Sequence, residues 1–268
     1  MTVWHILIVV TCYLAWRGFV WDPIALKKEQ VEIEIKDLPP GLRGMRIVHA
    51  TDLHLRNERI YEQRFVEMVR QAEPDLIVLT GDYTDNVRNL QVLAQVIRNL
   101  REICPVYAVL GDNDLNGHVP TADLTNAIED AGGVVLRNSG VEINRRNSQL
   151  YLAGIDDPRL PTASLQSALA GRSTPMPTLL LSHSALIYPQ AQEADVDLLL
   201  AGHTHGGQCC IPGFGALITN DKLGRRFASG LIREGRLQIY VSRGVGWAKL
   251  RVRFYCPPEV TVLALDRE

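Results

Sequence analysis

The sequence predicts an α/β fold with much parallel sheet, because short apolar runs alternate along the chain with stretches of helical periodicity. Six runs are apolar at nearly every position, as in strands buried on both faces: residues 45–50, 76–79, 106–110, 150–155, 178–181 and 198–201. Four other segments have helical spacing: residues 60–72, 87–101, 122–131 and 164–170. After Gln208 only short strand candidates follow, at residues 228–232, 237–241, 250–254 and 260–265. This change favours a more antiparallel second sheet.

The composition is that of a globular protein. The chain has 268 residues, of which 46% are hydrophobic and 22% charged, and its formal net charge is −2. That much apolar surface excludes disorder as the main state, and the charge balance argues against a basic nucleic-acid-binding protein. The five cysteines show no metal-binding CxxC spacing and are expected to be free thiols in a reducing compartment: Cys12, Cys104, Cys209, Cys210 and Cys256.

The first segment, residues 1–21, is predicted to be a retained membrane anchor. Residues 2–16 are almost entirely apolar, and as a helix they span about 22 Å, short of the roughly 30 Å hydrocarbon core. Extension to Trp21 gives the required length, with the Arg17 side chain snorkelling to the interface. No basic n-region or cleavage site of a signal peptide is present. The alternative is a buried core helix.

The next segment, residues 22–44, is expected to hold one strand and a linker. Residues 31–35 alternate in polarity and predict a strand, and the Pro-Pro-Gly linker at residues 37–41 is expected to lack regular structure. Residues 45–268 are then one domain. Arg17, Lys27 and Lys28 flank the anchor on this side, so the positive-inside rule places that domain on the cytoplasmic face of the membrane.

Five of the buried runs end in aspartate or histidine. The residues that follow these runs are Asp52-Leu53-His54, Gly81-Asp82, Gly111-Asp112-Asn113-Asp114, His183 and Gly202-His203-Thr204-His205. Ligands of open α/β sheets bind at the carboxyl ends of the strands, so these side chains are expected to converge. Carboxylates and imidazoles gathered in one place need a cation, and mixed nitrogen and oxygen ligands suit Zn, Mn or Fe. Seven ligands suit two ions that share a carboxylate, the arrangement that clamps both oxygens of a phosphoryl transfer.

In this order the motifs resemble the signature of the calcineurin-like metallophosphoesterases, from about residue 45 to the end of the chain. The resemblance implies a four-layer αββα sandwich, to which an N-terminal apolar anchor helix is added. The anchor, the Pro-Pro-Gly linker and the run GHTHGGQ are similar to the membrane-associated bacterial subgroup. That subgroup includes YkuE- and YaeI-like phosphodiesterases and UDP-2,3-diacylglucosamine pyrophosphatases.

Carried over position by position, the resemblance implies a metal ligand set. Asp52, His54 and His205 would hold the first metal. Asp112, His183 and His203 would hold the second, and Asp82 would bridge the two. Two divalent ions are expected, with Mn²⁺ favoured and Fe or Zn as alternatives.

The function implied is two-metal hydrolysis of a phosphodiester or pyrophosphate at the bacterial inner membrane, with the catalytic domain on the cytoplasmic side. The favoured substrate is a lipid nucleotide similar to UDP-2,3-diacylglucosamine. A general phosphodiesterase that acts on other lipid or nucleotide diesters is one alternative, and a non-catalytic metal-binding scaffold is the other. No nucleic-acid partner is expected.

The third motif departs from the family pattern. The sequence has GDND where the family has GNHD or GNHE, so Asp112 replaces an asparagine and Asn113 replaces a histidine. An asparagine can donate a hydrogen bond but cannot deliver a proton to a leaving group. The departure therefore favours either a scaffold or a substrate with a weakly basic leaving group, such as a pyrophosphate. Asp82 and Asn113 are the residues expected to act in catalysis, and His118 is the alternative replacement for the family histidine.

Several other polar residues have simpler interpretations. His49 is expected to pack in the core, and Asp85 and Asp114 to orient metal ligands. Asp156 and Asp157 follow a strand and form either a turn or part of the pocket. The pairs 145–146 and 225–226 are Arg-Arg, and each is either a pair of solvated charges or a clamp for a phosphate or lipid headgroup.

Overall fold

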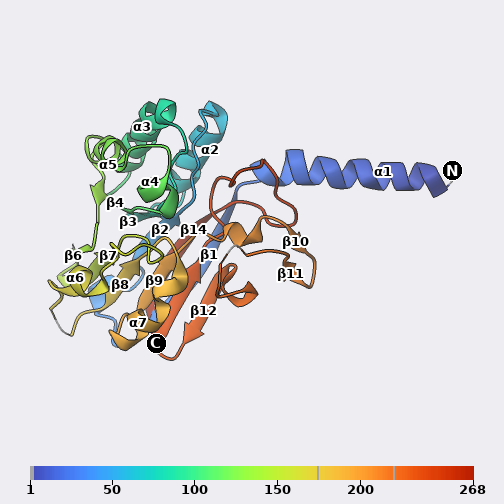
Figure 1. The fold of residues 1–268 in the computed structure, drawn as a ribbon. Coiled ribbons are helices and arrows are strands. Elements are labelled where there is room, and N and C mark those ends of the chain that lie inside the picture. The colour runs from blue at the N-terminus through green and yellow to red at the C-terminus, as the bar shows by residue number, and fades with distance from the viewer. Residues whose placement is uncertain (1–2, 174, 220) are drawn as a thin grey trace.

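In the computed structural model, which describes residues 3–173, 175–219 and 221–268, two six-stranded sheets pack face to face (Figure 1). The first sheet has the order β1 (Lys27–Ile35), β14 (Glu259–Arg267), β2 (Arg46–Ala50), β3 (Leu76–Thr80), β4 (Val106–Val109) and β5 (Val134–Val135). The second has the order β12 (Gly230–Glu234), β13 (Leu237–Val241), β9 (Leu198–Ala201), β8 (Thr178–Leu181), β7 (Ser148–Gly154) and β6 (Ser139–Arg145). A small hairpin, β10 (Cys210–Ile211) and β11 (Gly215–Ala216), stands apart from both.

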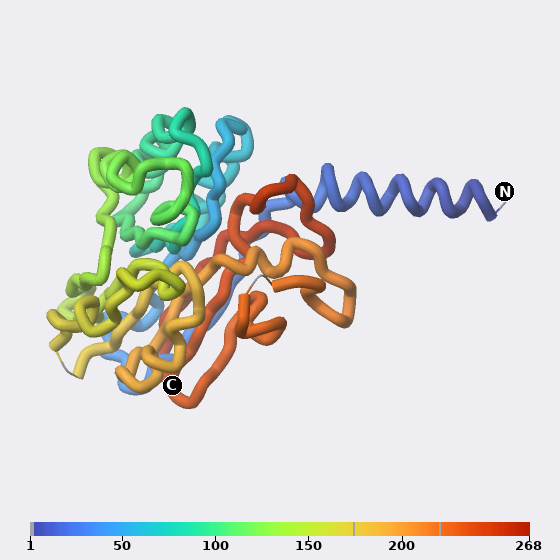
Figure 2. The backbone as a smooth tube through the Cα atoms, viewed as in Figure 1, coloured from blue at the N-terminus to red at the C-terminus, as the bar shows by residue number. Residues whose placement is uncertain are grey.

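Helices cover the outer face of each sheet. The first sheet carries α2 (Arg59–Arg70), α3 (Leu90–Arg101) and α5 (Thr121–Glu129), and the second carries α6 (Leu165–Leu169) and α7 (Tyr188–Glu193). The short helix α4 (Asp112–Asn116) follows β4. The N-terminal helix α1 (Val3–Trp16) projects alone from the body, as the tube in Figure 2 shows. The order helices, sheet, sheet, helices confirms the predicted four-layer sandwich.

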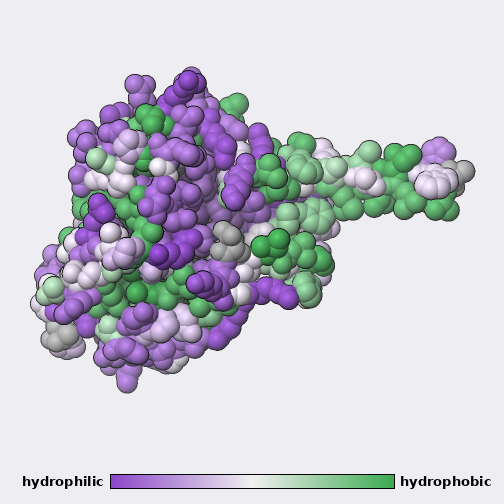
Figure 3. All heavy atoms as spheres, viewed as in Figure 1, coloured by the Kyte–Doolittle hydropathy of each residue, from purple (hydrophilic) through white to green (hydrophobic). Residues whose placement is uncertain are grey.

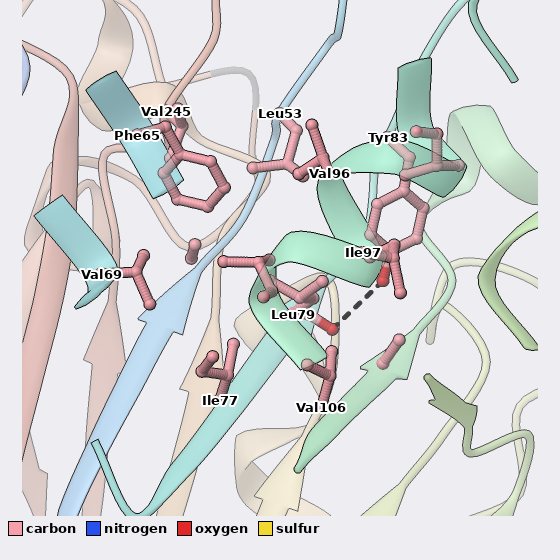
Figure 4. Close-up of a cluster of buried hydrophobic side chains, with 14 of the residues drawn as sticks. Leu53, Phe65, Val69, Ile77, Leu79, Tyr83, Val96, Ile97, Val106 and Val245 are labelled. Atoms are coloured by element: carbon pink, nitrogen blue, oxygen red, sulfur yellow. Dashed lines mark hydrogen bonds between the residues drawn. The ribbon is translucent and has the colours of Figure 1, made fainter. Parts of the chain in front are cut away.

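The alternation of side chains along the strands builds three separate hydrophobic cores. Along β3, Ile77 and Leu79 face the helices of the first layer, where Figure 4 shows them in one apolar cluster with Phe65 of α2 and Ile97 of α3. Leu76 and Val78, one residue out of phase, lie in the core between the two sheets. Because both faces of the strand are covered, the strand is apolar throughout, which is the pattern that the sequence shows.

The topology brings the carboxyl ends of six strands together. In the first sheet β2, β3 and β4 are adjacent and parallel, and in the second β7, β8 and β9 are adjacent and parallel. The two sets approach each other where β3 meets β8. Segments that follow these strands therefore meet at one end of the sandwich.

The strands and helices before Gln208 that the sequence predicts are confirmed to within a few residues. After Gln208 the later strands divide between the two sheets. β12 and β13 extend the second sheet as an antiparallel pair, in line with the predicted antiparallel character, and β14 inserts between β1 and β2 of the first sheet. The prediction is wrong for one strand. Residues 250–254 form no strand, and Phe254 makes only a single bridge to Cys209.

Smaller differences concern turns. Within the linker that is predicted to be irregular, Pro40–Leu42 form one 3-10 turn. The strands β5 and β6 are not foreseen. The turn between β6 and β7 places Arg146 and Asn147 in the left-handed region, at φ of +46° and +61°. Such a turn closes a hairpin without the Asn-Gly or Asp-Gly signal that would identify it in a sequence.

The N-terminal segment is a continuous helix of 22 residues, Val3–Ile24, and it is the one helix in the described part of the chain that is long and apolar enough to cross a membrane. No residue of α1 is buried, so this segment is not the buried core helix that was the alternative. Among the last residues of the helix, Arg17 pairs with Asp22 at 3.1 Å.

Candidate metal centre

All seven predicted metal ligands lie at the end of the sandwich where the six strands converge. Asp52 and His54 follow β2, Asp82 follows β3, and Asp112 begins α4 directly after β4. His183 follows β8, and His203 and His205 follow β9. Six of the seven side chains are buried, and Asp112 is half-buried.

The ligands form two groups. Asp52, His54 and His205 each offer one ligand atom, and these atoms all lie within 4.8 Å of one another. The shortest contact in this group joins His205 Nε2 to Asp52 Oδ1 at 3.1 Å.

The second group consists of Asp112, His183 and His203, again with ligand atoms within 4.8 Å of one another. Asp112 Oδ1 lies 3.2 Å from His183 Nε2 and 3.6 Å from His203 Nδ1. A third set of ligand atoms within the same distance of one another, from Asp52, Asp82 and His183, connects the two groups.

Asp82 lies between the two groups. Its Oδ2 atom is 3.6 Å from His54 Nε2 in the first group, and its Oδ1 atom is 3.6 Å from His183 Nε2 in the second. Asn113 is close by, and its side-chain amide donates a hydrogen bond to Asp82 Oδ2 at 2.5 Å. The carboxylate therefore faces both groups with one oxygen each.

Four buried ligand atoms of the cluster have no hydrogen bond: Asp52 Oδ1, His54 Nε2, Asp112 Oδ1 and His183 Nε2. Asp112 Oδ1 and His183 Nε2 face each other, Asp52 Oδ1 faces His205 Nε2, and His54 Nε2 faces Asp82 Oδ2, all at ion-pair distances. A buried polar atom without a hydrogen bond costs free energy of about 1–3 kcal/mol, and divalent cations in the two groups would offset that cost. The donor set of carboxylate oxygens and imidazole nitrogens fits Mn, Fe or Zn ions.

Hydrogen bonds on the far side of each ring orient the histidines. His183 Nδ1 donates to the Thr80 carbonyl at 2.7 Å, and His54 Nδ1 contacts Asp85 Oδ2 at 3.3 Å. Both contacts assign the proton to Nδ1 and leave the Nε2 lone pair directed into the cluster. Such outer partners fix the tautomer and the orientation of metal-binding histidines.

Asp114 holds the backbone around Asp82. Its carboxylate accepts hydrogen bonds from the amides of Asp82 at 2.7 Å, Gly111 at 2.8 Å and Tyr83 at 3.1 Å. Burial, together with the negative charge of Asp82, raises the pKa of Asp114 to about 7. Together with the contact of Asp85, these bonds agree with the positioning role expected for both residues.

The backbone at the cluster is strained. Five of the seven ligands have a positive φ, between +39° and +71°: Asp52, His54, Asp82, His203 and His205. Non-glycine residues rarely adopt this region, and such residues cluster at functional sites because the surrounding structure has to hold them there.

Two glycines allow the backbone to pass close to the ligand side chains. A β-carbon on Gly202 would lie 2.1 Å from Thr51 Oγ1, and one on Gly111 would lie 2.2 Å from Asp82 Oδ1. The sequence needs glycine at both positions because the chain passes against the ligands themselves.

The electrostatic field of the cluster is that of a cation site. Burial by itself would lower the pKa of His183, but the carboxylates of Asp82 and Asp112 raise it well above its usual value. Burial raises the pKa of Asp52, yet the facing histidines hold it well below its usual range. The carboxylates thus favour positive charge at His183, and Asp52 is kept in the anionic form that binds a cation.

Arg159 is a functional candidate that the sequence analysis missed. Its guanidinium lies 2.7 Å from His203 Nε2 and 2.5 Å from Asp112 Oδ1, and it also binds both oxygens of Asp157. A signal was available, since residues 156–159 follow β7 just as His183 follows β8. The two strands are neighbours, so both turns open onto the same site.

Two other candidate histidines are an exposed loop residue and a core residue. His118 is exposed in the loop after α4. His49 is fully buried and hydrogen-bonded to Thr80 at 2.8 Å, as expected for a packed core residue, and burial lowers its pKa to about 3. All five cysteines are free thiols, in agreement with the prediction, and Cys209 is half-buried.

Comparison with known proteins places the same residues in a family context. The family model of the calcineurin-like phosphoesterases matches residues 45–207, which contain every one of the seven ligands.

Similar proteins occur in distant organisms. The metallophosphoesterase YkuE of Bacillus subtilis is 31% identical over 250 residues, which cover 91% of this chain and 87% of YkuE. The phosphodiesterase YaeI of Escherichia coli is 34% identical over 200 residues, 73% of this chain and 72% of YaeI. A transmembrane protein with a metallophosphoesterase domain from Danio rerio is 32% identical over 97% of this chain and 62% of that protein.

Proposed function

Since the chain belongs to the calcineurin-like phosphoesterase family and is a metal-dependent phosphoesterase, we propose that its seven clustered ligands hold two divalent ions for the hydrolysis of phosphodiester or pyrophosphate bonds. The observation that carries this proposal is the pair of ligand groups with Asp82 between them. Mn²⁺ is the favoured ion, and Fe and Zn suit the same donors. When bound, two such ions supply a nucleophile at neutral pH and neutralise charge on the transferred phosphoryl group.

Residues around the ligands orient the ligand side chains and bind the substrate. Asp114 and the Asn113 amide fix the orientation of Asp82, and the partners of His54 and His183 fix their rings. Arg159 lies beside Asp112 and His203 with its side chain 26% exposed, so its guanidinium can also reach a substrate. Its Nε and Nη2 atoms are held by Asp157 and Asp112, and Nη1 keeps one N–H beyond its contact with His203. We assign Arg159 the role of donating this hydrogen bond to a phosphoryl oxygen.

The chemistry of Asn113 limits the substrates to those with a weakly basic leaving group. Asn113 stands where the family has a histidine, and its amide cannot protonate a departing oxygen. A pyrophosphate or an activated diester leaves without that help, whereas an alkyl monoester does not. We therefore propose a lipid nucleotide similar to UDP-2,3-diacylglucosamine as the substrate. A broader phosphodiesterase is the second candidate, supported by the similarity to YaeI.

We further propose that the protein is tethered to a bacterial inner membrane with its catalytic domain on the cytoplasmic side. The exposed apolar helix at Val3–Ile24 supports the tether, and so does the similarity to a transmembrane protein. The basic residues after the helix support the orientation.

The proposal is tested with purified full-length protein loaded with Mn²⁺. Bis(4-nitrophenyl) phosphate, 4-nitrophenyl phosphate and UDP-2,3-diacylglucosamine are offered in parallel. We expect turnover of the diester and the lipid nucleotide. The monoester releases the same 4-nitrophenolate as the diester, so its rate shows whether the site also accepts a phosphate dianion. Bound metal without turnover of any of the three would support the scaffold instead.

Replacement of Asn113 by histidine is expected to widen the range of leaving groups. The imidazole can donate a proton, so the rate on a phenyl diester should rise by about 10²-fold, the usual contribution of general acid catalysis. The rate on the nitrophenyl diester should change much less. Steady-state rates on the two diesters measure this, with Asn116→His as a matched control outside the cluster. Equal effects of Asn113→His on both substrates would contradict the account.

Replacement of Arg159 by methionine is expected to lower kcat/KM on the diester by about 10²-fold, because one charged contact to the phosphoryl group is lost. Arg159→Lys should recover only part of this rate, since lysine lacks the planar fork. Arg172→Met, which removes an arginine that contacts backbone carbonyls elsewhere, is the control. If Arg159→Met retains full kcat/KM, Arg159 has no role in binding the substrate.

A further inference from the structure

A group of exposed apolar side chains lies on the side of the body from which α1 projects. Figure 3 shows apolar residues gathered below the helix, at the place where Figure 1 draws β10 and β11. We name as the hairpin surface six side chains that are each between 39% and 74% exposed: Ile211, Phe214, Leu217, Ile218, Leu250 and Tyr255. Apolar side chains exposed together mark an interaction site.

The hairpin surface is joined to the base of α1 by hydrogen bonds. The Gly18 carbonyl accepts a bond from the Arg253 amide at 3.0 Å, and Asp22 Oδ2 accepts one from the Tyr255 amide at 2.7 Å. The Arg17 guanidinium lies 3.7 Å from the centre of the Tyr255 ring. The end of the helix and the loop at residues 252–255 are therefore held together.

The same loop is bonded to the hairpin. The Phe254 carbonyl accepts a bond from the Cys210 amide, and the Phe254 amide donates to the Gln208 carbonyl, both at 2.8 Å. The base of α1, the loop and the start of the hairpin thus form one connected unit.

The length of the helix determines where this unit lies relative to the hydrocarbon core of a membrane. Val3–Ile24 has 22 residues, or about 33 Å of helix, and a hydrocarbon core of roughly 30 Å takes nearly all of it. The base of the helix must then reach the boundary of the hydrocarbon core. Because the loop is bonded to that base and the hairpin to the loop, the hairpin surface reaches the same boundary.

The charges around the hairpin surface suit anionic lipid headgroups. Lys222, Arg225 and Lys249 are exposed within a few residues of the two segments that carry it. Arg226 and Arg251 are exposed as well, and each pairs with a glutamate, Glu234 and Glu58. The Arg225 guanidinium lies 4.1 Å from the centre of the Phe214 ring. Basic side chains beside apolar ones are typical of proteins that bind the surface of a bilayer, where each cation contributes to attraction by the anionic leaflet.

We infer that the hairpin surface docks onto an anionic phospholipid bilayer, the same one that holds α1. This inference rests on the membrane tether of the proposed function and adds a second contact to it. A single helix would leave the body free to tilt and rotate, whereas two contacts fix one face of the body against the membrane.

Docking would set the position of the metal centre. The hairpin begins five residues after His205, and the Cys210 thiol lies 3.3 Å from the Gly206 carbonyl. The hairpin is thus packed against the turn that carries His205. The substrate class that fits this placement is a phosphoester in the headgroup layer of the bilayer, held by its own acyl chains.

The test uses the full-length protein in vesicles of phosphatidylcholine and phosphatidylglycerol that carry a trace of diazirine-labelled phospholipid. After photolysis, mass spectrometry locates the labelled peptides. We expect label in the peptide that covers residues 209–219 as well as in α1. Val134 is 41% exposed on β5, the edge strand opposite β1 in the first sheet, and this residue should remain unlabelled. Label confined to α1 would overturn the inference.

A double variant, Phe214→Ser with Ile218→Ser, provides a second test in the same labelling experiment. Loss of two inserted side chains should lower the label at residues 209–219 about tenfold and leave the label in α1 unchanged. The control is Val87→Ser with Val134→Ser, which should not change either label. Unchanged labelling of the hairpin in the Phe214 and Ile218 variant would contradict docking.

Hydrolysis of soluble bis(4-nitrophenyl) phosphate separates this inference from the proposed function. The double variant should keep this activity, because neither side chain belongs to the metal centre. If the wild-type protein does not hydrolyse the diester, the proposed function fails, while the labelling result still decides whether the hairpin docks.

Discussion

Replacing Asp82 with alanine is expected to abolish phosphodiester hydrolysis, with a loss of at least about 10³-fold in kcat. Asp82 directs one carboxylate oxygen toward each ligand group, and each oxygen lies 3.6 Å from a histidine nitrogen. Its removal leaves two separate sets of three ligands with no shared anion. Charge stabilisation at the phosphoryl group depends on both ions, so the loss falls on kcat rather than on KM.

The stability of the folded protein provides a second readout for Asp82. A ligand that binds only the native state raises the free energy of unfolding, by about 2.7 kcal/mol at a hundredfold excess over its dissociation constant. Mn²⁺ should therefore raise the melting temperature of the wild type and raise that of Asp82→Ala much less. Asp130→Ala, which removes an exposed aspartate after α5, is the matched control and should behave as the wild type does. An Asp82→Ala protein that responds fully to Mn²⁺ would show that the ligand assignment is wrong.

The largest loss of stability is expected from Arg253→Met. Arg253 is fully buried in the loop beside the metal centre and donates to backbone carbonyls of several segments. The acceptors are Arg243 at 2.8 Å, Gly246 at 3.0 Å, Cys256 at 3.2 Å, Gly244 at 3.3 Å and His205 at 3.4 Å. Methionine fills much of the volume but leaves these buried carbonyls without donors. Breaking such a network costs about 3–5 kcal/mol of unfolding free energy.

Urea denaturation of the metal-free protein measures the effect of Arg253→Met. Arg251 offers a control two residues away, because its side chain is 45% exposed and pairs with Glu58 at 3.2 Å. Removal of such a surface pair should cost no more than about 1 kcal/mol. Equal losses for the two variants would mean that the network around Arg253 carries little stability.

Local patterns in the sequence are sufficient to predict most of the fold. The strands of the two sheets that lead to the site are buried on both faces, so each is an apolar run that ends in polar ligands. Because the carboxyl ends of neighbouring parallel strands lie together, the position of each ligand in the chain also predicts its position in space. Asp52 and His183 are far apart in the sequence, yet both follow strands of this kind.

What the sequence does not reveal depends on contacts between distant segments. The segment with Arg253 alternates in polarity and resembles a strand, but its arginine points inward to cap carbonyls of other loops. No local pattern distinguishes an inward arginine from a solvated one. The placement of β14 between β1 and β2 is likewise decided by tertiary packing. The role of Arg159 also depends on tertiary contacts, with Asp112 and His203, so no local pattern in the sequence predicts it.

The most direct test of the two-metal centre is anomalous diffraction at the manganese edge from crystals of the Mn²⁺-loaded protein. The account predicts two peaks in each molecule. One should be contacted by Asp52, His54 and His205, the other by Asp112, His183 and His203, with Asp82 between them. A single peak, or peaks that these residues do not contact, would contradict it.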